Sequence, residues 1–194
     1  MSFYDDPKNA AGYIKMCEGY DAGAQLQTLY NALPDGSDLL EIGSGPGNDL
    51  ALLAQHYNVT GSDSSDEFVR HLAARFPKLP ILKIDAGSLE MPNTFDAIYS
   101  NKVLHHFDDT DLAKSFAAQA NLLNEGGLVF HLIWQVIDEM PDMGDLPFIA
   151  RNEAQIADLM GPKFEILGVE PFAEFSDNDS LAILARTYAT PSSS

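Results

Sequence analysis

The chain has 194 residues, of which 45% are hydrophobic and 21% charged, and this composition predicts one globular domain with a substantial core. Its net charge of −18 argues against binding to nucleic acid or to anionic membranes, because the long-range field has the wrong sign. Cys17 is the single cysteine, which excludes an internal disulfide and a cysteine-rich metal site. We find no signal peptide and no membrane-spanning apolar run, and therefore expect a cytoplasmic protein.

Residues 1–36 are expected to form a helical cap ahead of the main domain. Two helices are predicted here, the first beginning at Pro7, and Pro34-Asp35-Gly36 marks a turn after the second. Tyr13 and Tyr20 lie in this segment. We expect each of them either to pack against the sheet or to lie over a bound cofactor or substrate, where an aromatic face stabilises a cation.

A strand, a tight turn and the start of a helix are predicted across residues 39–50. The apolar strand carries Glu41 near its end, and Gly43, Gly45 and Gly47 follow at alternate positions. Glycine lets the backbone turn sharply and approach a ligand closely, because it has no Cβ. The pattern therefore predicts a ligand-binding turn, and a purely structural strand–turn–helix is the alternative.

The chemistry around this turn argues against a dinucleotide. The dinucleotide-binding pattern G-x-G-x-x-G would place its third glycine where this chain has Asn48. Pro46 removes a backbone donor that a phosphate would use, and Glu41 would repel a pyrophosphate. A carboxylate at this position suits a ligand that carries a positive group and no phosphate.

Two further strands are predicted to end in acids at the same edge of a parallel sheet. Asp63 closes a strand over residues 59–63 and comes about 20 positions after Gly43, a separation at which nucleotide-binding folds place an acid on the ribose hydroxyls. The alternative role for Asp63 is to cap the next helix, which Ser64 or Ser65 could do equally well. Asp85 and Ala86 close the strand predicted over residues 80–86 and could contact an adenine edge.

The rest of the chain continues as alternating strands and helices. A fourth strand is followed by Asn101 and the His105-His106 pair, and a helix then ends at Asn124-Glu125-Gly126-Gly127. Trp134 closes a fifth strand, and residues 135–148 form a long connection of the kind that often carries substrate contacts. The remaining predictions are strands over 94–100, 128–134, 164–169 and 180–188, the last two in an antiparallel hairpin, a helix over 151–160, and a frayed tail at 190–194.

Taken in this order, the segments resemble the class I S-adenosylmethionine-dependent methyltransferases. The resemblance covers about residues 37 to 189, which would form one domain. It implies an α/β, Rossmann-like fold with a seven-stranded, mostly parallel sheet, a C-terminal antiparallel hairpin, helices on both faces and an N-terminal helical cap. It rests on Glu41-Ile42-Gly43-Ser44-Gly45-Pro46-Gly47, Asp63, Asp85, Ser100 to His106, and Asn124-Glu125-Gly126-Gly127.

The same resemblance implies S-adenosylmethionine as the cofactor and assigns residues to its parts. Glu41 would lie at the methionine end of the donor, and Asn101 would lie beside the amino acid group. The residues expected to contact the donor are Glu41 and Gly43 at the methionine end, Asp63 at the ribose, Asp85 and Ala86 at the adenine, and also Gly45, Gly47, Ser64 and Asn101.

The resemblance supplies no catalytic base. Methyl transfer can rely on positioning and water exclusion when the acceptor is already nucleophilic. His105 and His106 are the candidate proton acceptors, although at least one of them is expected to be packed or engaged with Asp108. Trp134, with Tyr13 and Tyr20, is expected to contact the substrate. No metal site is predicted.

The leading interpretation is methyl transfer to an unidentified small molecule. The alternatives are a non-catalytic relative that only binds the donor and an NAD-dependent reductase. Expected partners are a small-molecule acceptor and, at most, a second copy of the chain in a homodimer, with no nucleic acid and no membrane.

Overall fold

The computed structural model describes residues 3–20, 22–137 and 148–188. A seven-stranded sheet runs through them in the order β3-β2-β1-β4-β5-β7-β6. Six strands are parallel, and β7 is antiparallel to its neighbours β5 and β6, which confirms the predicted fold. The strands are β1 (Asp38–Ile42), β2 (Asn58–Asp63), β3 (Ile81–Lys83), β4 (Phe95–Asn101), β5 (Leu123–Trp134), β6 (Phe164–Phe172) and β7 (Ser180–Thr187).

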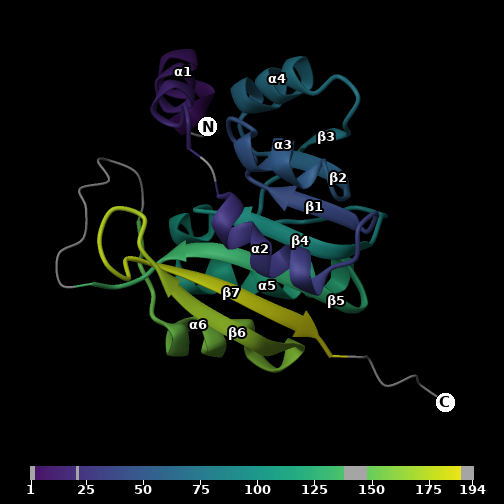
Figure 1. Ribbon diagram of the computed structural model, residues 1–194, viewed down its shortest axis with the longest axis vertical. Helices are drawn as coiled ribbons and strands as arrows, with labels where there is room; N and C mark the ends of the chain where they lie inside the picture. The colour runs from purple at the N-terminus through teal and green to yellow at the C-terminus, as the bar shows by residue number, and fades with distance from the viewer. Residues whose placement is uncertain (1–2, 21, 138–147, 189–194) are drawn as a thin grey trace.

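Helices cover both faces of the sheet, and each face has its own hydrophobic cluster (Figure 1). On one face lie α2 (Gly23–Ala32), α3 (Asn48–Leu53) and α4 (Asp66–Arg75), and on the other lie α5 (Asp109–Leu122) and α6 (Glu153–Met160). Alternate residues of β4 feed the two clusters: Ile98 packs with the α5 side and Tyr99 with the α2 side.

Two predicted boundaries were wrong. The strand predicted over residues 80–86 ends at Lys83, and Asp85 lies beyond it in a turn where its Oδ1 accepts a hydrogen bond from the Gly87 N–H at 2.8 Å. The helix predicted to end at 124–127 ends at Leu122 instead. Residues 124–127 belong to the start of β5, because Leu123 already pairs with Phe95 of β4. The tail at 190–194 lies outside the described residues, as does most of the connection predicted over 135–148.

The carboxyl ends of the parallel strands point toward α1 (Pro7–Met16) and the loop between β6 and β7 (Figure 1). The short 3₁₀ helix η1 (Phe3–Asp5) and α1 pack beside α4: the Tyr4 ring lies 5.1 Å from the rings of Tyr13 and Phe68. In contrast, α2 joins the core cluster on its face of the sheet. None of the described helices is long and apolar enough to cross a membrane.

Candidate active site

Only glycine fits at the first position of the turn after β1. Gly43 has φ +66°, in the left-handed region, and a Cβ there would lie 2.5 Å from Cγ2 of Val103. Its backbone and that of Gly45 instead form the wall of a cavity. A ligand in this cavity could therefore come close to the backbone of the turn.

Gly47, at the N-cap of α3, allows a direct test of how tightly the turn is packed. Gly47 and Gly36 have nearly the same φ, +81° and +82°, but a Cβ on Gly47 would lie 2.6 Å from Phe76 Cε2, whereas one on Gly36 meets nothing within 4 Å. We expect Gly47→Ala to lower the free energy of unfolding by about 1–3 kcal/mol more than Gly36→Ala, because only the former overpacks the core. Urea denaturation of both variants measures the difference, and equal losses would contradict it.

Asp63 is buried at the end of β2 and braces the glycine turn. Its Oδ2 accepts a hydrogen bond from the Gly45 N–H at 3.0 Å, and its Oδ1 accepts one from the Ser65 N–H at 2.9 Å. Ser65, through its Oγ, caps α4 at the Phe68 N–H. Burial raises the pKa of Asp63, and the backbone hydrogen bonds act in the opposite direction. Because Ser65 supplies the cap, Asp63 is left to line the cavity.

A first cavity of about 320 Å³ opens between the glycine turn and the ends of β2 and β4. All residues predicted to contact the donor line it except Glu41, which lines a second cavity, and Gly47, which lines neither. Apolar walls come from Phe3, Ile84 and Phe107. The structure thus brings Asp63, Ser64, Asp85 and Ala86 around one cavity, as the sequence predicts.

The second cavity, of about 270 Å³, adjoins the first and shares with it Tyr13, Gly43, Gly45, Asn101 and Lys102. Several buried side-chain atoms on its walls lack a hydrogen-bond partner within the described part of the chain. An unsatisfied buried polar atom costs about 1–3 kcal/mol, so a complementary ligand would be strongly favoured here. These atoms are Glu41 Oε2, Asn101 Oδ1, His105 Nδ1, Trp134 Nε1 and Glu174 Oε2.

The end of this cavity beside the glycine turn is acidic. Glu41 is only 3% exposed, and burial together with the Asp49 charge holds its pKa well above the ordinary value. Asp49 accepts hydrogen bonds from the Tyr99 hydroxyl at 2.8 Å and from Asn101 Nδ2 at 2.9 Å. Two neighbouring carboxyl groups in a buried setting favour a ligand with a positive charge.

The structure separates the two candidate histidines, which lie in the 3₁₀ helix η2 (Leu104–His106). His105 lines the second cavity and His106 the first, and their ring centroids are 4.0 Å apart. Burial lowers the pKa of His105 to about 2, with smaller contributions from His106 and Lys102. The His105 ring is therefore neutral at physiological pH, which makes it a hydrogen-bonding group of very low basicity.

Tyr20 and Trp134 line the second cavity, and Tyr13 lines both cavities, so the structure brings the three predicted substrate residues together. The Tyr20 hydroxyl accepts a hydrogen bond from Asn101 Nδ2 at 3.1 Å, which ties the N-terminal segment to the end of β4. All three residues that are predicted to contact the substrate therefore lie around the same cavity.

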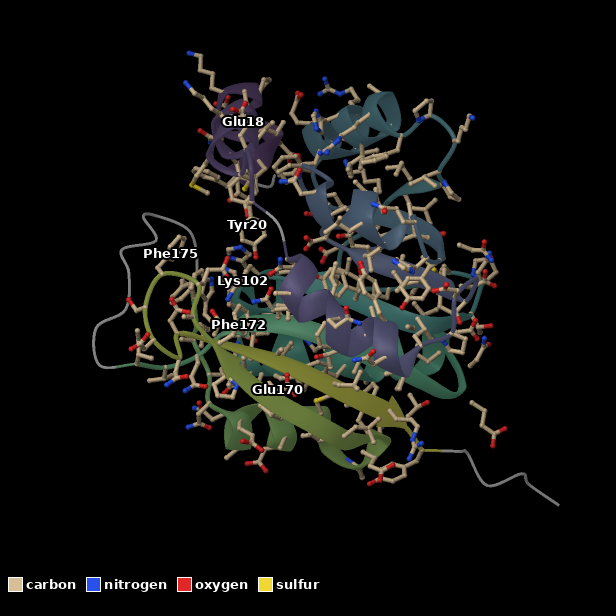
Figure 2. The ribbon with its side chains drawn as sticks, viewed as in Figure 1. Glu18, Tyr20, Lys102, Glu170, Phe172 and Phe175 are labelled. Atoms are coloured by element: carbon tan, nitrogen blue, oxygen red, sulfur yellow. The ribbon has the colours of Figure 1, made fainter. Side chains whose placement is uncertain are left out.

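Sequence reasoning missed three residues of this cavity: Lys102, Glu174 and Phe175. Lys102 has φ +55° and holds its Nζ 3.7 Å from the centre of the Trp134 ring, while donating to the Ile133 carbonyl and to Ser180 Oγ. Figure 2 shows Lys102, Phe172 and Phe175 with Tyr20 at the carboxyl end of the sheet. No motif marks Glu174 and Phe175, because β6 and β7 bring them there from a distant part of the chain, whereas Lys102 directly follows β4.

Asp179 fixes the β6–β7 loop that carries Glu174 and Phe175. This buried carboxylate accepts backbone N–H hydrogen bonds from Glu174 at 2.8 Å, Phe175 at 2.8 Å and Ser176 at 2.9 Å. The Phe175 ring in turn stacks on Trp134, with centroids 5.7 Å apart. Asp179 therefore holds the loop whose Glu174 and Phe175 line the cavity, and an acid just before a strand is the one sequence signal for it.

Within residues 3–20, 22–137 and 148–188, no group of three or more His, Cys, Asp or Glu side chains could hold a metal ion. The second cavity is lined by carboxyl groups, the neutral His105 ring, aromatic rings, the Cys17 thiol and the Lys102 amine.

Part of the chain is similar to known proteins. Residues 39–127 match a methyltransferase domain family. The chain is 36% identical over 106 residues to an uncharacterised methyltransferase of Mycobacterium tuberculosis, a match that covers 52% of this chain and 54% of the relative. It is 33% identical over 81 residues to trans-aconitate 2-methyltransferase of Enterobacter, covering 40% of this chain and 32% of that protein. The matches thus span between about a third and about half the length of these relatives.

Solved structures share the fold over nearly the whole chain. A methyltransferase from Clostridium acetobutylicum superposes with a TM-score of 0.74 at 19% identity, covering 94% of this chain and 99% of its own. The cyclase SpnF superposes with a TM-score of 0.73 at 18% identity, covering 96% and 94%. The fold alone therefore does not fix the reaction. Residues 39–127 are thus similar to a methyltransferase domain family, and the seven-stranded fold is similar to that of a solved S-adenosylmethionine-dependent methyltransferase.

Proposed function

We propose that this chain transfers a methyl group from S-adenosylmethionine to a small-molecule acceptor. The observation that carries the proposal is the pair of joined cavities at the glycine turn, with unpartnered polar atoms on the walls of the second. The first cavity offers what a nucleoside needs, and the second offers acidic groups at one end and aromatic groups at the other. A phosphate-free, positively charged nucleoside complements both.

In this proposal the first cavity holds the adenosine. Asp63, with Ser64 beside it, accepts hydrogen bonds from the ribose hydroxyls, since a carboxylate can accept from both at once. Asp85 and the Ala86 backbone contact the adenine. Glu41 and Asn101 face the amino acid end, where the unpartnered Glu41 Oε2 would accept from an ammonium group.

The far wall of the second cavity would hold the acceptor. When bound, S-adenosylmethionine would supply an electrophilic methyl group and leave as a neutral thioether that keeps the electron pair of the broken C–S bond. Tyr13, Tyr20 and Trp134 would orient the acceptor for in-line attack and exclude water from the site. Of the two histidines, His105 is unsuited to accept a proton, because burial lowers its pKa to about 2 and leaves the ring very weakly basic; His106 is therefore the proposed proton acceptor.

Calorimetry combined with mass spectrometry tests the proposal. We expect micromolar binding of S-adenosylmethionine and S-adenosylhomocysteine, no binding of NADH, and a mass increase of one methyl group on a member of an acceptor panel. Binding of NADH without S-adenosylmethionine would support a reductase instead. Donor binding with no transfer to any acceptor would support a non-catalytic relative.

The proposed setting is the cytoplasm, with the chain acting as a monomer or homodimer. The name of one relative makes trans-aconitate the first acceptor to include in the panel. The charge of the second cavity, however, favours a cationic acceptor over an anionic one.

A further inference from the structure

We propose that the acceptor is a small amine, recognised by the carboxylate of Glu174. This inference rests on the proposed methyl transfer and assigns the substrate class of the second cavity. It follows from an unpartnered carboxylate oxygen, the net charge of the walls and an aromatic surface next to that oxygen.

Glu174 presents an acceptor atom that the described part of the chain leaves without a hydrogen bond. Its side chain is 10% exposed, and its Oε2 is buried on the wall of the second cavity. The nearest cation is Lys102, whose Nζ lies 3.5 Å from that oxygen. This distance is too long for a hydrogen bond of normal strength, so the oxygen can still accept an N–H from a ligand.

Lys102 is ion-paired with Glu174 and also has closer partners. Its Nζ donates to Ser180 Oγ and the Ile133 carbonyl, and lies over the Trp134 ring. Burial lowers the pKa of Lys102 to about 8, against the opposing charges of Glu174 and Asp179, so the ammonium form still predominates at neutral pH. The lysine therefore forms an ion pair with Glu174, while its hydrogen bonds go to Ser180 and to the Ile133 carbonyl.

The charges of the cavity select against an anionic acceptor. Glu41, Asp49 and Glu174 line it, and Lys102 is the only lysine or arginine among its described lining residues. Glu41 and Asp49 flank the glycine turn in the chain, whereas Glu174 comes from the β6–β7 loop, next to Phe175, whose ring stacks on Trp134. An amine can pair with Glu174, but a carboxylate would face it across a buried space at a cost of several kcal/mol.

The surface next to Glu174 is aromatic. Phe175 is stacked on Trp134 and is 74% exposed, and both residues line the cavity. A flat apolar group would pack against this surface while its amine reached Glu174. The neutral His105 ring and the Trp134 N–H remain available for an uncharged polar group of the same molecule.

Fluorescence of Trp134, the single tryptophan, reports on this wall directly. The protein is saturated with S-adenosylhomocysteine and titrated with benzylamine, benzyl alcohol and benzoate, which share a ring and differ in the charge of the head group. We expect benzylamine to bind at least about tenfold more tightly than benzoate, with the alcohol between them. Glu174→Gln should weaken benzylamine binding about tenfold and leave benzyl alcohol unchanged.

Glu170→Gln is the matched control, because Glu170 is exposed on the same hairpin and lies outside the second cavity, farther along the strand (Figure 2). It removes the same charge and should leave all three affinities unchanged. Equal binding of benzylamine and benzoate, tighter binding of benzoate, or no response to benzylamine would overturn the amine proposal. Failure of the proposed methyl transfer is recognised separately, because no member of the acceptor panel would then gain the mass of a methyl group, whether or not S-adenosylhomocysteine binds in the first step of the titration.

Discussion

Replacing Glu41 by glutamine is expected to stabilise the donor-free protein and to weaken S-adenosylmethionine binding at the same time. The donor-free protein holds this carboxyl group 3% exposed, near the Asp49 charge and with one oxygen unpartnered. Removing the charge should raise the free energy of unfolding by about 1–2 kcal/mol, equivalent to roughly 2–8 °C in Tm. Donor affinity should fall about tenfold or more, because the charge-assisted hydrogen bond to the donor's ammonium is lost.

The pH dependence of this stabilisation has a definite sign. The pKa of Glu41 is raised in the folded state, so as pH rises through the ordinary glutamate range the unfolded chain loses its proton first. The folded state then binds more protons than the unfolded state, and wild-type stability falls as pH rises toward the raised pKa. The advantage of Glu41→Gln should therefore grow over the same interval.

Calorimetric melting between pH 4 and 8, roughly the window in which the raised pKa acts, measures this difference, and titration with S-adenosylmethionine measures affinity. The exposed Glu170→Gln variant serves as the control for loss of one negative charge. A glutamine variant that melts below the wild type, or that binds the donor equally well, would rule out the assigned role of Glu41.

Replacing Asp63 by alanine is expected to weaken S-adenosylmethionine binding by about 1–3 kcal/mol, through loss of charge-assisted hydrogen bonds to the ribose. Asp63 also accepts N–H hydrogen bonds from Gly45 and Ser65, so the alanine variant should lose some stability as well. Asp63→Asn keeps a side-chain oxygen for one of these contacts and loses the charge. It should therefore separate the effect on binding from the effect on the turn.

Binding of adenosine and adenine provides the specific measurement for Asp63. If this carboxylate holds the ribose, both substitutions should weaken binding of adenosine and leave binding of adenine nearly unchanged. Equal losses for adenosine and adenine would mean that Asp63 acts only by bracing the glycine turn.

The fold could be predicted from sequence because its signals are local. Glu41 and Asp63 each close a short apolar run, and glycines follow the first of them at alternate positions. The carboxyl ends of parallel strands lie at one edge of the sheet, so the sequence alone is enough to predict that these residues lie close together. The end of the third strand was predicted too late, at residue 86, because a strand ends where its pairing with the neighbouring strand ends. The pairing of β3 with β2 ends at Lys83.

The acceptor wall could not be predicted in the same way. Glu174 and Phe175 reach the cavity because β7 runs antiparallel beside β5, and because Asp179 holds the loop through three backbone N–H groups. Lys102 forms an ion pair with Glu174 of the β6–β7 loop, and its Nζ lies over the Trp134 ring. These placements depend on contacts between residues far apart in the chain, and no short pattern encodes them.

A crystal structure of the chain with S-adenosylhomocysteine tests the central claim most directly. The account predicts ribose hydroxyls within hydrogen-bonding distance of Asp63, adenine beside Ala86, and the amino group of the ligand facing Glu41. A ligand bound away from the joined cavities, or turned so that its amino group points from Glu41 into solvent, would contradict it.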